Sequence, residues 1–154
     1  MAKKNILDEN SWRKTFKANC AIFIRLYSLI LLKIFVKVGS KNKLKRFREN
    51  ETFQNVFQPT REEVVGDLMP LKGKWNSDFF KNDNPLVLEL GCGKGEYSVG
   101  LAEKYPDKNF IGIDIKGARF WRGAKTAVET GLHNVAFVRT QSELINHIFA
   151  ENEV

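Results

Sequence analysis

The chain has 154 residues, of which 43% are hydrophobic and 28% charged, a composition typical of one soluble domain with a buried core. Its formal net charge of +7 is uneven, because residues 1–74 carry 16 Lys and Arg against 7 Asp and Glu, whereas residues 75–154 carry 9 against 11. The two cysteines, Cys20 and Cys92, exclude a dense disulfide framework and lack a metal-ligand spacing, so we expect free thiols in a reducing cytosol and no bound metal.

The first 38 residues form a leader that is basic and then strongly apolar. Residues 21–36, AIFIRLYSLILLKIFV, contain Arg25 and Lys33, and a membrane-spanning helix usually needs about 20 predominantly apolar residues. No small-residue cleavage site follows this stretch. A helix that is buried or lies on a surface is therefore the better interpretation, and a membrane span is the alternative left open.

Residues 39–84 are interpreted as a basic N-terminal arm and linker. The stretch 39–60 begins with a helix-like basic piece and closes as a polar loop at Pro59, and glycines and a proline break any long helix in 61–84. The run KNKLKRFR, residues 41–48, contains no acid and can neutralise phosphates of RNA, although a solvated arm has the same charge pattern. The candidate RNA contacts in this run are Lys41, Lys43, Lys45, Arg46 and Arg48.

From residue 85 onward, short apolar runs alternate with amphipathic stretches, which predicts strands and helices in turn. The predicted strands are residues 86–90, 109–115 and 135–140. The predicted helices are residues 96–104, 118–130 with Gly131 as its C-terminal cap, and a last one from a Ser142 cap to about residue 149. This order is typical of a parallel α/β sheet.

A glycine-rich turn, GCGKG at residues 91–95, joins the first predicted strand to the first predicted helix. Asp114 stands at the end of the second strand, where a carboxylate can accept both hydroxyls of a ribose. A dinucleotide site would prefer a glycine at the position of Glu96, and Glu89 lies just before the turn. These acids oppose a pyrophosphate but attract the sulfonium and ammonium groups of S-adenosylmethionine. The turn therefore favours a cationic adenosyl cofactor, with a purely structural tight turn as the alternative.

Several segments resemble the bacterial tRNA (guanine-N7)-methyltransferases: ELGCGKGEYSVGLAEKYPDKNFIGIDIKGARFWRGAKTA, the later GLHNVAFVRTQ, and the upstream KNKLKRF and NVFQP. The resemblance covers roughly residues 39–154, with the segments in the same order. It implies a Rossmann-like class I methyltransferase fold, of which residues 85–154 hold only the N-terminal, cofactor-binding half. It also implies a cytoplasmic enzyme that transfers a methyl group from S-adenosylmethionine to N7 of a guanine in the tRNA variable loop.

The resemblance assigns cofactor roles by position. Glu89 matches the family's acid near the amino-acid moiety of the cofactor, and Asp114 matches the acid that holds the ribose. Gln141 falls where the family commonly has an acid near the adenine, and an amide there can still donate and accept hydrogen bonds. Gly91 and Gly93 of the turn complete the candidate cofactor-binding set.

The second predicted helix carries Arg119, Arg122 and Lys125 at three-residue steps beside Trp121. A basic face there could extend the RNA track of residues 41–48, with Arg119 and Arg122 as further candidate contacts, or it could be an ordinary exposed face.

No catalytic residue is assigned. Guanine N7 already exposes a lone pair, so methyl transfer requires orientation rather than proton removal. The family's substrate-site Asp follows a fourth strand and would lie beyond Val154. Without that strand, residues 86–90 would present an unpaired edge, so we expect self-association and little activity. The alternatives are an inactive fragment that binds S-adenosylmethionine or RNA, and a methyltransferase for another substrate.

Overall fold

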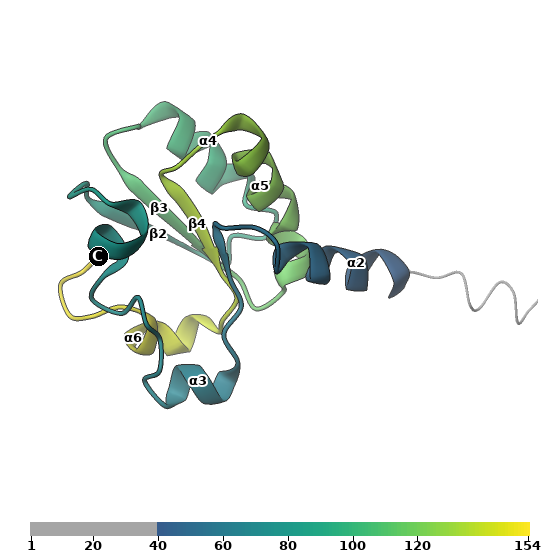
Figure 1. Ribbon diagram of the computed structural model, residues 1–154, viewed down its shortest axis with the longest axis horizontal. Helices are drawn as coiled ribbons and strands as arrows, with labels where there is room; N and C mark the ends of the chain where they lie inside the picture. Colours follow the sequence, from purple (N-terminus) through teal and green to yellow (C-terminus); the bar gives the residue numbers. More distant parts are fainter. Residues whose placement is uncertain (1–39) are drawn as a thin grey trace, which may run out of the picture. The chain divides into compact units, whose positions relative to one another are not determined.

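The computed structural model describes residues 40–154 and places a four-stranded parallel sheet at their centre, in the order β1-β4-β3-β2 (Figure 1). The strands are β1 (Val56–Phe57), β2 (Leu86–Leu90), β3 (Asn109–Ile113) and β4 (Val135–Val138). The helices and helical turns are α2 (Ser40–Asn50), α3 (Arg61–Val65), η1 (Trp75–Phe80), α4 (Glu96–Lys104), α5 (Gly117–Thr130), η2 (Ser142–Leu144) and α6 (Ile145–Ile148). The predicted parallel α/β fold is confirmed, and the three predicted strands are neighbours in the sheet.

The short strand β1 comes from the segment interpreted as an arm and linker. Val56 pairs in parallel with Phe137 of β4, and the N–H groups of Phe137 and Arg139 donate to the carbonyls of Asn55 and Phe57, both at 2.8 Å. The sheet therefore includes a strand from residues 39–84, in addition to the three strands of residues 85–154.

Helices cover both faces of the sheet (Figure 1). On one face, buried residues of α4 and α5 pack against β3 and β4 around Phe120 and Phe137, whose rings stack with centroids 5.6 Å apart. On the other face, α3, η1 and α6 pack around Trp75, Ile111 and Ile113, all fully buried. β3 and β4 are buried along their whole length, which explains why they lack the alternating pattern of a strand with one face in solvent.

Most predicted boundaries agree with the structure, and the last helix is the exception. Gly131 caps α5 in the left-handed conformation, with φ of 70°, as expected. Ser142, in contrast, lies inside η2 instead of capping a single helix, and the predicted helix is divided into η2 and α6. The prediction of a Ser142 cap is wrong, because Gln141 occupies the position before the helical turn and makes no side-chain cap there.

The leader of residues 1–38 and its candidate membrane segment, residues 21–36, lie outside the described residues. Within residues 40–154, no helix has the length and apolar character needed to cross a bilayer.

Candidate cofactor site

The glycine turn between β2 and α4 depends on backbone conformations that side chains rarely adopt. Gly91, Gly93 and Gly95 have φ of 72°, 57° and 73°. At Gly95, a Cβ would lie 2.5 Å from a ring carbon of Phe137, so this position also requires a close approach to the sheet. The N–H groups of Gly91 and Cys92 both donate to the Ile113 carbonyl, at 2.8 and 2.9 Å, which fixes the turn to the end of β3.

Asp114, the residue after β3, connects the turn to the next loop. One carboxylate oxygen accepts the Gly93 N–H at 3.0 Å, and the other accepts the Lys116 N–H at 2.7 Å. The side chain is buried, yet it lines a cavity. Because each carboxylate oxygen has a second lone-pair site, both can accept one further hydrogen bond from a ligand.

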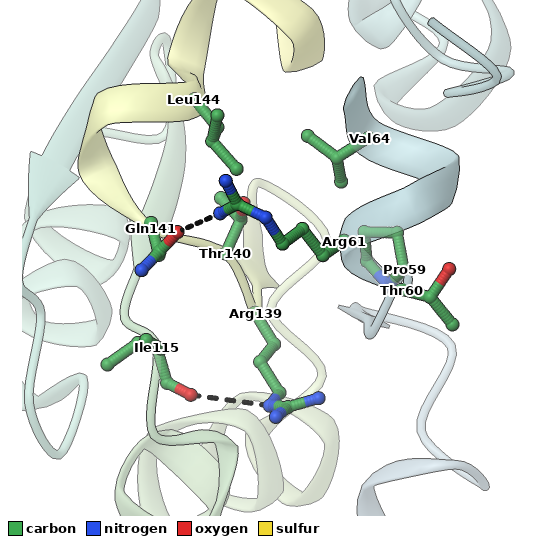
Figure 2. Close-up of a pocket in the computed structure, with 9 residues that line it drawn as sticks. All are labelled: Pro59, Thr60, Arg61, Val64, Ile115, Arg139, Thr140, Gln141 and Leu144. Carbon is green, nitrogen blue, oxygen red and sulfur yellow. Dashed lines mark hydrogen bonds between the residues drawn. The ribbon is translucent and has the colours of Figure 1, made fainter. Parts of the chain in front are cut away.

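This cavity, of about 350 Å³, lies at the carboxyl ends of β2, β3 and β4. It brings together three of the five predicted cofactor residues, Gly91, Asp114 and Gln141. A neighbouring cavity of about 220 Å³, drawn in Figure 2, also contains Ile115, Thr140 and Gln141 in its wall. In an open parallel sheet, ligands bind outside the carboxyl ends of the strands, and both cavities lie at this edge of the sheet.

The remaining two predicted residues act on the turn without lining the cavity. Gly93 contributes through its N–H to Asp114, and the Glu89 carboxylate accepts a hydrogen bond from the Ser98 hydroxyl of α4. Burial raises the pKa of the Cys92 thiol to about 12, and the negative charges of Glu89 and Asp114 add to this shift. The carboxylates of Glu89 and Asp114 therefore create a negative electrostatic potential near Cys92, and this potential would stabilise a cationic ligand at the turn.

Basic residues of α2, α5 and the glycine turn form a second candidate site, here called the basic surface. Its members are Arg46, Lys94, Arg119 and Arg122, which line a cavity of about 330 Å³. The Arg46 guanidinium lies 4.9 Å from the centroid of the Trp121 ring, and the indole N–H donates to Glu49 at 3.0 Å. This contact joins α2 to α5, so the structure brings together predicted RNA contacts that are far apart in sequence.

The other predicted RNA contacts lie elsewhere or outside the description. Lys43, Lys45 and Arg48 are exposed on α2 but do not line the cavity of the basic surface, and the side chain of Lys41 is not described. Lys94 also belongs to the basic surface but was not predicted as an RNA contact. A glycine-rich turn predicts the conformation of the backbone and does not indicate which surface its lysine side chain joins. The ring of Trp121 is in contact with two cations, because the Arg46 guanidinium covers one part of it and the Lys125 ammonium lies 5.3 Å from its centroid.

Two arginines beside the cofactor cavity were also missed. Arg61, from α3, donates to the amide oxygen of Gln141 at 2.6 Å, and Arg139 donates to the Ile115 carbonyl at 3.3 Å (Figure 2). Arg61 is the first residue of α3, which begins at a capping box of Thr60 and Glu63, but no sequence signal places this short helix beside Gln141. Among residues 40–154, no cluster of three or more His, Cys, Asp or Glu side chains could hold a metal ion.

Comparison with known proteins gives a family match for residues 83–154, with the description "putative methyltransferase". A protein of Christiangramia forsetii named tRNA (guanine-N(7)-)-methyltransferase is 73% identical over 117 residues, which cover 76% of this chain and 52% of that protein. Proteins of the same name from Bacteroides fragilis and Levilactobacillus brevis are 54% and 41% identical, over 74% and 60% of this chain and 45% and 43% of their own lengths. The chain thus spans about half the length of the curated relatives it matches.

Proposed function

We propose that this chain, whose residues 83–154 match the model of a putative methyltransferase family, is the cofactor-binding part of a tRNA (guanine-N7)-methyltransferase. The observation that carries the proposal is the cavity in which Gly91, Asp114 and Gln141 meet at the carboxyl ends of parallel strands. The names of the relatives supply the reaction and the substrate class. A cytoplasmic location belongs to the same proposal.

S-adenosylmethionine is the proposed cofactor, and the described residues divide its recognition. The second lone-pair sites of the Asp114 carboxylate would accept the two ribose hydroxyls. Gln141, which lines the same cavity, would contact the adenine. Glu89, held by Ser98, would favour the ammonium group of the amino-acid moiety through its negative charge.

The basic surface is the proposed contact for tRNA. Arg46, Arg119 and Arg122 can neutralise backbone phosphates, and such contacts give affinity that falls with salt and depends little on base sequence. Arg119 lines both the cofactor cavity and the cavity of the basic surface, so an RNA bound there would lie beside the cofactor.

The chemistry makes a small demand on the protein. S-adenosylmethionine would supply an electrophilic methyl group to the lone pair of guanine N7, with its S–C bond breaking to release S-adenosylhomocysteine, the positive charge passing to the base and no proton being lost. The described residues therefore need only bind the cofactor in one orientation and hold its charge beside Glu89 and Asp114. Placement of two reactants in an in-line arrangement can account for most of the acceleration.

The test uses the 154-residue chain in two measurements. Isothermal titration calorimetry with S-adenosylmethionine should show binding that depends on Asp114. Transfer of a tritiated methyl group to unmodified tRNA, with nucleoside analysis for 7-methylguanosine, tests the reaction itself. Binding without transfer would favour the fragment alternative, transfer to another nucleoside would favour a different substrate, and absence of binding would contradict the cofactor proposal.

A further inference from the structure

Gln141 is held by Arg61 in an orientation that restricts what it can recognise. A guanidinium has only hydrogen-bond donors, so the atom of Gln141 that lies 2.6 Å from Arg61 Nη1 must be the amide oxygen. A hydrogen bond with a charged donor is shorter and stronger than a neutral one. The amide of Gln141 therefore has one favoured orientation, with its oxygen directed at α3.

The amide nitrogen of Gln141 makes no contact with Arg61. Figure 2 shows this nitrogen directed away from Arg61, on the side of Ile115. Gln141, Ile115 and Thr140 line both the cavity that contains Asp114 and the neighbouring cavity that contains Arg61. Asp114 and Gln141 line the same cavity, so a base attached to a ribose held by Asp114 would share that cavity with Gln141.

We infer that Arg61 is a positioning residue that makes Gln141 a hydrogen-bond donor toward the cofactor's adenine. This inference rests on the proposed cofactor and deepens it. An acid at position 141 could only accept, and would select the exocyclic amino group of adenine. In a Gln141 whose oxygen is directed at Arg61, the N–H groups point away from Arg61, and the acceptors that adenine offers them are its ring nitrogens N1, N3 and N7. The adenine is thus recognised through a ring nitrogen.

The test compares S-adenosylhomocysteine with its 1-deaza, 3-deaza and 7-deaza analogues, each of which replaces one ring nitrogen by C–H. Calorimetry with the 154-residue chain should show that one replacement lowers affinity about five- to tenfold, the usual effect of one lost hydrogen bond. In Arg61→Met, which keeps the length of the side chain but cannot donate, the amide is free to turn and the discrimination should shrink to less than twofold. Arg61→Lys, which can only donate, should retain it.

Gln141→Glu supplies the complementary variant. A carboxylate paired with Arg61 has no donor, so the discrimination among deaza analogues should vanish, while S-adenosylhomocysteine itself still binds. Thermal unfolding of each variant verifies that the fold is intact. Binding with equal affinity for all four ligands in the wild-type chain, or unchanged discrimination in Arg61→Met, would overturn the inference alone. Failure of the wild-type chain to bind S-adenosylhomocysteine at all would overturn the inference together with the proposed cofactor.

Discussion

The N–H of Gly93 donates to the carboxylate of Asp114 at 3.0 Å, so the acid at the end of β3 holds the glycine turn that follows β2. Two segments 21 residues apart thereby share one hydrogen bond at the mouth of the cofactor cavity. The same carboxylate has the free acceptor sites proposed for the ribose, so the proposal gives one side chain two roles, in the shape of the turn and in cofactor binding.

Asp114→Asn should weaken binding of S-adenosylmethionine more than tenfold. The substitution keeps the shape but replaces one acceptor oxygen by a donor, so either a backbone N–H or a ribose hydroxyl loses its partner, at a cost of about 1.5–3 kcal/mol for a charged acceptor. Calorimetry measures the change. Asp107→Asn, at an exposed position before β3, is the matched control and should bind as the wild type does. Equal affinities for the two variants would contradict the role of Asp114.

Gly95→Ala and Gly100→Ala should have opposite effects on stability, although both lie at or in α4. At Gly95 the methyl group meets Phe137 at 2.5 Å and φ is 73°, so we expect a loss of roughly 2–4 kcal/mol. At Gly100 nothing lies within 4 Å of the added Cβ, and alanine should stabilise the helix by up to about 1 kcal/mol. Urea unfolding followed by circular dichroism measures both. A Gly95→Ala protein as stable as the wild type would show that the turn is not packed as described.

The Cys92 thiol should make stability depend on pH in the alkaline range. Its pKa is raised from 9.0 to about 12, so the folded chain holds the thiol proton more tightly than the unfolded chain does. The resulting stabilisation is complete below pH 9 and is lost as pH rises from 9 toward 12. Unfolding free energies of the wild type and Cys92→Ala, measured at several pH values, should converge over this window. A constant difference would mean that burial does not disfavour the thiolate.

The sequence predicted most accurately the helices and strands with a periodic or apolar pattern, and the residues that directly follow a strand. β2 and α4 were placed at their observed bounds because the apolar run and the helix are each bordered by glycine. The meeting of Asp114 and Gln141 was also predictable, since both follow parallel strands. β1 was not, because two residues in a polar loop have no periodicity, and the residues of β4 with which they pair are 81 positions further along the chain. Arg61 was missed for the same reason: only the folded chain places it beside Gln141.

Arg46→Ala and Arg122→Ala should each weaken tRNA binding and reduce its salt dependence. Each lost phosphate contact lowers the slope of log affinity against log salt by about 0.7–0.9, and the loss should be similar for different tRNAs. Fluorescence anisotropy between about 50 and 200 mM salt measures the slope. Lys104→Ala, at the C-terminal end of α4 and exposed, is the control. An unchanged slope in both arginine variants would remove the basic surface from the RNA site.

The 154-residue chain should self-associate through the edge of β2. In the described part of the chain, β2 pairs with β3 on one side and with no strand on the other, and an open strand edge is a template for pairing. Leu90, at the end of β2, is 51% exposed, so Leu90→Lys should oppose pairing by charge and shift the protein toward monomer. Leu44→Lys, 59% exposed on α2, adds the same charge away from this edge and should not. Sedimentation velocity over a range of concentrations measures the association. A wild-type chain that stays monomeric would contradict the prediction. The β2 edge would also not be the contact if the Leu44→Lys variant dissociated as Leu90→Lys does.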